Sequence, residues 1–215
     1  IAACIVNGTC TLYCNDIASS AATAMPAADT GQVNAYVIGA GNNRYWSGYL
    51  ADLRVTKGTA LYTSNFVPPN ALLTPVQNST LLLSGASGGI IDSATQTNFE
   101  TFGDARISTA VTKFSGYSSI YFDGTGDYLA STNFLALGSG DFTIEGWLYA
   151  TSINNTGIFH YATSLFPGST TGIALAFYNT GAWQLYYANG SQTNGAATGG
   201  ATNTWIHFAI TRNGT

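Results

Sequence analysis

Short runs of β-branched and aromatic residues recur along the chain and are separated by Gly, Asn, Asp and Ser. Such runs, bounded by turn residues, are typical of β-strands. Apolar residues do not recur at a 3.6-residue period over any long window, so the pattern does not favour helices. We therefore expect strands throughout, and the clearest ranges are 34–38, 48–55, 80–84, 118–122, 127–130, 142–150, 157–162, 172–178, 183–188 and 204–212.

The predicted turns contain dipeptides that suit tight hairpins, because Asn, Asp and Gly tolerate a positive φ. These dipeptides are Asn7-Gly8, Asp123-Gly124, Asn189-Gly190 and Asn213-Gly214. Many short strands joined by short turns predict a sandwich of two antiparallel sheets. In the last predicted strand, Ile206, Phe208 and Ile210 alternate with His207. We expect the three apolar residues to face the core and His207 to face the other way.

The composition excludes several classes of protein. The chain has 215 residues, of which 46% are hydrophobic and 7% are charged, against roughly 25% charged residues in an ordinary soluble domain. Such a chain is too apolar for a disordered protein, and no apolar stretch reaches the ~20 residues of a membrane span. Six Lys and Arg against ten Asp and Glu do not favour nucleic acid, which needs basic clusters. We expect neither nucleic-acid binding nor membrane insertion.

The N-terminal segment carries all three cysteines, Cys4, Cys10 and Cys14. It has neither an initiator Met nor the basic start of a signal peptide, so we expect a mature product or a fragment. The cysteine spacing does not match the Cys-x-x-Cys pattern of zinc and redox sites. Two alternatives stay open: small buried thiols in strands, or one local disulfide between Cys4 and Cys14.

One strand-and-turn pattern occurs twice. Residues 2–9 and residues 208–215 are both short apolar runs that end in Asn-Gly-Thr, and they start 206 residues apart. The chain is therefore about one repeat period long. Residues 10–17 look like the returning strand of the hairpin that Asn213-Gly214 opens.

Several segments of the second part of the chain carry a resemblance to a known family. They are Leu81–Leu83, Asp104–Ala110, Lys113–Gly116, Tyr121–Leu129, Gly140–Trp147 and Trp205–Gly214. Together they resemble the N-terminal part of a laminin-G-like, pentraxin-like module of the concanavalin A-like lectin/glucanase superfamily. Residues 48–58 and 61–69 resemble the end of such a module. The resemblance implies an all-β, jelly-roll sandwich of two antiparallel sheets.

The order of the two parts departs from the family. Residues 1–74 resemble the C-terminal part of a module, residues 75–79 form a linker, and residues 80–215 resemble the N-terminal part. A permuted module closed within the chain would explain this order. A tandem array in which neighbouring copies exchange strands would explain it equally well, because an open sheet edge invites pairing with another chain.

Few residues are available for catalysis. The only two Glu are Glu100 and Glu145. The laminarinase branch of the superfamily uses a cluster of Glu and Asp on one strand, but here Thr143 and Trp147 flank Glu145 on its strand face. Glycoside hydrolysis needs two carboxylates close together. We therefore expect that the chain is not an enzyme.

A calcium site is predicted at the hairpin Asp123-Gly124-Thr125-Gly126-Asp127, where Asp123 and Asp127 would supply carboxylate oxygens. Many relatives in the superfamily bind calcium near their glycan site. The alternative is a hairpin whose Asp side chains accept backbone N–H bonds. Neither His160 nor His207 has the neighbours of a catalytic triad or the spacing of a zinc site.

Glycan binding uses exposed aromatic rings beside amide and hydroxyl groups. The predicted glycan-binding residues are Tyr45, Trp46, Tyr161, Trp183, Tyr187, Asn42, Asn43 and Asn179. For each aromatic residue the alternative is packing in the core, to which we assign Trp147. Sequons permit glycosylation at Asn7, Asn78, Asn154, Asn189 and Asn213.

Tandem modules that are poor in charge resemble those of phage tail fibres, virion surface proteins and bacterial adhesins. We expect a non-enzymatic structural and adhesive repeat unit of an extracellular or virion fibre, with neighbouring copies and cell-surface glycans as partners. The low charge suits faces that meet other modules, where a buried charge would be costly. The alternative is a carbohydrate-binding module of a secreted polysaccharide-degrading enzyme.

Overall fold

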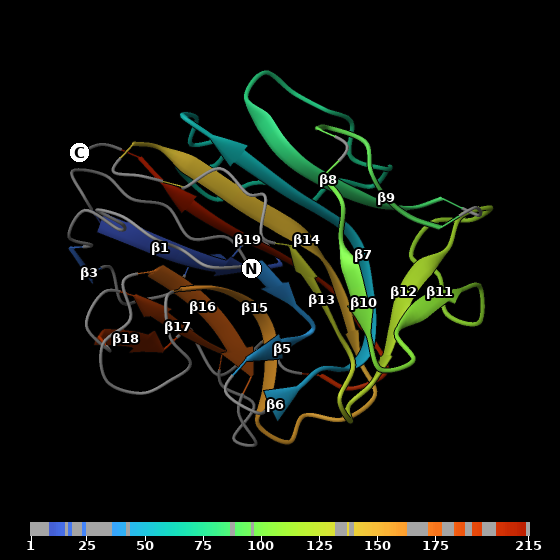
Figure 1. The fold of residues 1–215 in the computed structure, drawn as a ribbon. Coiled ribbons are helices and arrows are strands. Elements are labelled where there is room, and N and C mark those ends of the chain that lie inside the picture. Colours follow the sequence, from blue (N-terminus) through green and yellow to red (C-terminus); the bar gives the residue numbers. More distant parts are fainter. Residues whose placement is uncertain are drawn as a thin grey trace.

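The chain folds as two antiparallel β-sheets that pack against each other (Figure 1). The structure is a computed structural model that describes residues 9–15, 17–18, 23–24, 36–41, 44–86, 89–95, 97–131, 137, 140–162, 172–177, 183–187, 191–194 and 201–213. Within these ranges every regular element is a strand, so the predicted all-β sandwich is confirmed. No helix in this described part is long and apolar enough to cross a membrane.

The larger sheet contains ten strands. Seven follow one another across it: β11 (Arg106–Ser108), β12 (Ser119–Asp123), β7 (Ser47–Lys57), β14 (Phe142–Ala150), β19 (Trp205–Arg212), β1 (Thr9–Cys14) and β2 (Ile17–Ala18). The other three are β3 (Thr23–Ala24), which pairs with β1, β8 (Ser79–Ala86), which pairs with β7, and β9 (Gly89–Asp92), which pairs with β8.

The smaller sheet contains seven strands. In order they are β10 (Glu100–Phe102), β13 (Tyr128–Ser131), β4 (Tyr36–Ile38), β15 (Thr156–Ala162), β16 (Gly172–Phe177), β17 (Trp183–Tyr187) and β18 (Ser191–Asn194). A separate pair is formed by β5 (Ala40–Gly41) and β6 (Arg44–Tyr45). The ten predicted strands all appear within one or two residues of their expected bounds, whereas β3, β5, β6, β9, β10, β11 and β18 were not predicted.

The main core lies between the two sheets and is built by residues that alternate along the strands, apart from register shifts in β7 and β15. From the larger sheet, Leu50, Leu148 and Ile206 point inward, and Phe159 and Leu175 do so from the smaller sheet. In β19, Ile206, Phe208 and Ile210 all belong to this core, while His207 is buried on the opposite face. The predicted alternation of the last strand is therefore confirmed.

The first and last described strands lie side by side. β1 pairs antiparallel with β19, so that Cys10 lies opposite Arg212 and Leu12 opposite Ile210. Residues 10–17 were expected to form the returning strand beside the last strand, and residues 10–14 of them occupy that position within the same chain. β7 likewise lies between β14 on one side and β12 and β8 on the other. Strands from both parts of the chain thus build one sandwich, and the assignment of residues 1–74, 75–79 and 80–215 to parts of a module stays a prediction.

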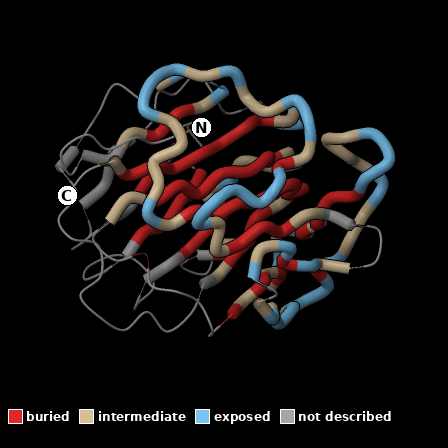
Figure 2. Tube along the Cα trace, turned by 90° about the horizontal axis from the view of Figure 1, so that it is seen from above, coloured by how far each residue is buried: buried red, intermediate tan, exposed pale blue. Residues whose placement is uncertain are grey.

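The segment between β7 and β8 crosses the outer face of the larger sheet, and we call residues 58–74 the strap. Figure 2 shows exposed and half-buried segments lying across buried strands. The amide of Leu61 donates to Thr143 Oγ1 at 2.9 Å, and the amide of Leu73 donates to Asp52 Oδ2 at 2.9 Å. Tyr62 and Phe66 of the strap pack on Tyr13 and Ala209, in a second, smaller apolar cluster.

A β-bulge in β7 sets which side chains lie beneath the strap. Pairing with β14 shifts register between Glu145 and Trp147, and Asp52 has a φ of 52°. A bulge inserts one unpaired residue, which shifts the alternation of the residues after it by one position. As a result Leu53 and Val55 stay in the core, and Arg54 faces outward beside Glu145.

Candidate functional site: an aromatic row on the larger sheet

Four aromatic side chains lie in a row on the outer face of the larger sheet, and we call them the aromatic row. They are Tyr121 on β12, Tyr49 on β7, Tyr149 on β14 and Trp205 on β19, and each lies opposite the next in the strand register. The distances between successive ring centres are 5.0, 5.8 and 5.5 Å. The row is therefore continuous across four neighbouring strands.

The alternation of the strands directs these four rings outward. Each ring is adjacent in sequence to an aliphatic residue of the main core, which must face inward; these residues are Ile120, Leu50, Leu148 and Ile206. Tyr49 has a ring on both sides and is only 9% exposed, whereas the other three rings are half-buried. The row therefore contributes to the surface of the molecule.

Arg106 on β11 lies against the ring at one end of the aromatic row. The guanidinium carbon of Arg106 lies 4.6 Å from the centre of the Tyr121 ring. Its Nη1 atom also donates to Asp104 Oδ2 at 2.7 Å. Both side chains of this ion pair are exposed, and its positive charge is balanced by the carboxylate. The end of the row thus carries no uncompensated charge.

The row has a covered border and a polar border. On one side, Trp147 is covered by Lys113, whose Nζ lies 3.7 Å from the ring centre, and by the edge of Phe114. Partial burial lowers the pKa of Lys113. On the other side, the hydroxyls of Ser47 and Thr151 lie 2.8 Å apart at the surface. Trp147 is buried as expected, although it lies on the outer face and not between the sheets.

Residues 123–215, which include β14 and β19, match a laminin G family model described as the concanavalin A-like lectin/glucanases superfamily. This segment is similar to proteins of that superfamily. The match and the two antiparallel sheets confirm the resemblance expected from the sequence. No curated protein and no solved structure gave a match.

Glu145, the strongest catalytic candidate of this segment, is fully buried beneath the strap. Arg54 donates from Nε to Glu145 Oε1 at 2.9 Å, and its Nη2 forms an ion pair with the same oxygen. The Tyr62 hydroxyl donates to Oε2 at 2.6 Å, and His207 Nε2 lies 3.3 Å from that oxygen. Every oxygen of this carboxylate therefore already has partners.

The charges of this cluster follow from burial and pairing. Burial alone would raise the pKa of Glu145, but the adjacent His207 and the positive charge of Arg54 lower it below its usual value. Burial lowers the pKa of His207 to about 4, so its imidazole is neutral at neutral pH. Burial and the Glu145 carboxylate raise the pKa of the Tyr62 hydroxyl.

This geometry makes Glu145 a structural residue that holds the strap. Arg54 Nη1 also donates to the carbonyl of Thr74 at 2.8 Å, which fixes the end of the strap to the same cluster. Glu100, the second Glu, lies on β10 in the other sheet, so the fold does not bring the two together. A glycosidase needs two carboxylates facing one substrate bond, and these two do not form such a pair.

The predicted calcium hairpin has a third carboxylate that the sequence did not suggest. Carboxylate oxygens of Asp104, Asp123 and Asp127 lie within 4.8 Å of one another. Asp127 is fully buried and accepts the amides of Asp104 at 2.8 Å and Asp123 at 2.9 Å. Asp123 accepts the amide of Thr125 at 2.6 Å. These bonds match the alternative interpretation, in which the Asp side chains of the hairpin accept backbone N–H bonds. Calcium binding at Asp123 and Asp127 stays a prediction.

Two of the predicted glycan-binding residues are wrong. Trp46 and Trp183 are each 1% exposed and belong to the main core, where Trp183 packs 4.5 Å from Phe177. Trp183 follows the alternation of β17, in which Leu185 also faces the core, and Trp46 lies between β6 and β7. Tyr45 is half-buried on β6. The side chains of Tyr161 and Tyr187, and all of Asn42, Asn43 and Asn179, lie outside the described residues, so their role stays a prediction.

The residues that form the aromatic row were missed by sequence reasoning. The signal was present, because each ring stands next to an aliphatic residue in a predicted strand, which places it on the outer face. What the sequence did not provide was the register that aligns the four rings.

The structure describes some of the residues predicted to form a disulfide or to be glycosylated. Cys14 is half-buried against the main core, and Cys4 lies outside the described residues, so their disulfide stays a prediction. Asn78 and Asn154 are exposed in turns, and Asn213 is half-buried after β19. Asn7 and Asn189 lie outside the described residues. Glycosylation at all five stays a prediction.

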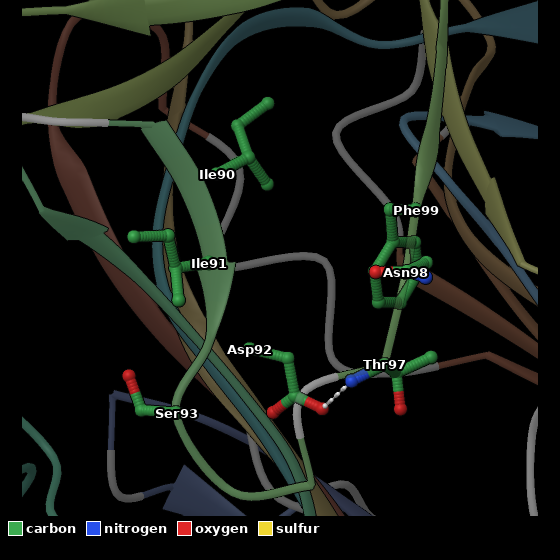
Figure 3. Close-up of a pocket in the computed structure, with 7 residues that line it drawn as sticks. All are labelled: Ile90, Ile91, Asp92, Ser93, Thr97, Asn98 and Phe99. Carbon is green, nitrogen blue, oxygen red and sulfur yellow. Dashed lines mark hydrogen bonds between the residues drawn. The ribbon is translucent and has the colours of Figure 1, made fainter.

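A pocket of about 430 Å³ opens between β9 and the segment before β10 (Figure 3). It is lined by Ile90, Ile91, Asp92, Ser93, Thr97, Asn98 and Phe99. Burial alone would raise the pKa of Asp92, but the amides of Leu82, Thr97 and Ala94 lower it by donating to its carboxylate. Asp92 is occupied by these bonds, so the isoleucines and Phe99 supply the apolar part of the lining, and Ser93, Thr97 and Asn98 supply the polar part.

Proposed function

We propose that the chain is a non-enzymatic structural and adhesive unit of an extracellular or virion fibre. In this proposal it associates with neighbouring copies of itself and binds cell-surface glycans. The concanavalin A-like match supports a lectin-like or adhesive module in general terms. The fibre role and the glycan ligand go further and rest on the following features.

The main support for association between copies is the register of β1 on β19. Cys10 lies opposite Arg212, and the repeated Asn-Gly-Thr segments are 206 residues apart. In an array with that period, the strand after the Asn213-Gly214-Thr215 turn would pair with β19 in the same register, closing a three-residue hairpin. The position beside β19 therefore suits either the chain's own β1 or the equivalent strand of a neighbouring copy.

Two further features support adhesion over catalysis. The aromatic row offers ring surfaces of the kind that bind sugars. Glu145 is tied to Arg54 and Tyr62 beneath the strap, which is the arrangement of a structural carboxylate.

Cross-linking tests the association directly. Thr11 lies opposite Thr211 in the β1–β19 pairing, so Thr11→Cys and Thr211→Cys are made separately in a chain whose natural cysteines are alanine. The two single variants are mixed, refolded at high protein concentration and oxidised. Covalent dimers in the mixture, and multimers of the unmodified chain by light scattering, are the expected results.

The control is a chain that carries both substitutions, which closes within one molecule when β1 stays on its own β19. The proposal is wrong if the mixture gives no covalent dimer and the chain is a monomer at every concentration.

A second candidate is a carbohydrate-binding module of a secreted polysaccharide-degrading enzyme, which the same aromatic row favours. Such a module would bind glycans as a monomer, so the light-scattering measurement separates the two functions.

A further inference from the structure

We propose that the aromatic row is the binding surface for a single extended chain of uncharged sugars. This inference rests on the proposed adhesive function and assigns its ligand class and its place. The half-buried rings of Tyr121, Tyr149 and Trp205 would contact sugars along the chain, and Tyr49, 9% exposed, would support the rings on either side of it.

The shape of the surface favours a linear ligand. Four neighbouring strands spaced ~4.8 Å apart make the row roughly 15 Å long. The next row on the same face begins two residues along each strand, about 7 Å away, and there Trp147 is covered by Lys113 and Phe114. The open strip therefore measures on the order of 100 Å², far below the ~800 Å² that each partner buries in a standard protein interface.

The chemistry of the strip favours sugars. Sugar rings present C–H groups that pack on aromatic faces and hydroxyl groups that need hydrogen-bond partners. Successive rings of the row are tilted by 48°, 78° and 57°, so both faces and edges are presented. The tyrosine hydroxyls and the paired hydroxyls of Ser47 and Thr151 provide polar groups along the strip.

The charge of the strip favours a neutral ligand. Within the described part of the chain, Arg106 is the one cation found against the row, and its guanidinium is held between the Tyr121 ring and Asp104. At the same end Asp123 is exposed, and an anionic sugar would meet these carboxylates. A chain of uncharged hexoses avoids that repulsion.

The chain contains a reporter for binding. Of its four tryptophans, Trp205 alone is half-buried, and the other three are at most 6% exposed. Cellohexaose, mannohexaose and maltohexaose are titrated as neutral probes and hexagalacturonate as the charged comparison. At least one neutral hexasaccharide is expected to shift the emission of Trp205, and the charged one is expected to bind at least tenfold more weakly.

Variants then locate the site by calorimetry. Removing a ring at either end, with Tyr121→Ala or Trp205→Ala, is expected to weaken binding about tenfold. Tyr121→Phe and Trp205→Phe keep a ring and are expected to retain most of the affinity, which separates lost stacking from lost folding. The matched control is Tyr117→Ala, because Tyr117 is 48% exposed in the loop beside the row; its affinity is expected to be unchanged.

The outcomes separate this inference from the proposed function. If the chain binds a neutral hexasaccharide and neither end variant weakens it, the assignment of the row is wrong, while adhesion to glycans stands. If the chain adheres to cells but binds only charged sugars, the ligand class is wrong. If the end variants abolish association between copies and no sugar binds, the row is a protein interface and the inference is overturned.

Discussion

Neutralising Glu145 tests whether this residue is a structural anchor. In Glu145→Gln the side chain keeps its shape and can still accept the Tyr62 hydroxyl, but it loses the charge that faces Arg54. The Arg54 side chain is 7% exposed and that of Glu145 is fully buried. Removing one partner of such a buried pair leaves an uncompensated charge and costs about 3–5 kcal/mol.

That loss is large for a protein of this size. Domains are typically stable by about 5–15 kcal/mol, so the variant would lose roughly a fifth or more of its free energy of unfolding. For 150–250 residues each kcal/mol moves the melting temperature by roughly 2–4 °C, and the variant is expected to melt roughly 6–20 °C below the wild type. Urea unfolding followed by tryptophan fluorescence gives the free energy itself.

A double-mutant cycle completes this test. Arg54→Met alone is expected to cost a similar amount, because it leaves the Glu145 carboxylate without its cation. The double variant Arg54→Met with Glu145→Gln removes both charges and is expected to be no less stable than either single variant. The reasoning is refuted if Glu145→Gln changes stability by less than about 0.5 kcal/mol, as an ordinary surface substitution would, or if the two costs simply add.

Three further outcomes are expected. Burial raises the pKa of Asp52 from 3.8 to about 6, so the folded state binds a proton more tightly than the unfolded state. As the pH rises from 4 to 6, the free energy of unfolding of the wild type should therefore fall by up to about 3 kcal/mol relative to that of Asp52→Asn. Urea unfolding at each pH measures it, and the same pH dependence in both proteins would contradict this. Tyr62→Phe keeps the ring but loses the bond to the Glu145 carboxylate, so unfolding free energy should drop by about 1.5–3 kcal/mol; an unchanged value would mean that the strap is held elsewhere. Iodide should quench the emission of Trp205 alone, and Trp205→Phe should abolish quenching; quenching that survives in the variant would contradict the burial of the other tryptophans.

Much of the fold follows from local sequence pattern. The strands of 142–150 and 205–212 were predicted almost to the residue, because alternation is a property of neighbouring positions. The short strands β9, β10 and β11 were missed because each includes a charged residue, Asp92, Glu100 or Arg106, which interrupts the short apolar run that indicates a strand. The bulge at Asp52 was missed for a related reason: it breaks alternation in β7, and nothing in the sequence marks which residue is extra.

The candidate site was less accessible to sequence reasoning. Tyr49 and Tyr149 are 100 positions apart in the chain, and only the pairing of β7 with β14 places them opposite each other. Strand pairing between distant segments is a tertiary property that no local pattern encodes. Residue type alone indicated Trp46 and Trp183 instead, whose side chains pack in the main core.

One incubation compares adhesion with catalysis most directly. The folded chain is mixed with insoluble neutral polysaccharides, and the sediment and supernatant of the same sample are assayed for bound protein and for released reducing sugar. Protein that sediments with a polysaccharide, with no sugar released, is the predicted result for a binding unit whose Glu145 anchors the strap. Release of soluble sugar that Glu145→Gln abolishes, at a temperature where the variant stays folded, would contradict it.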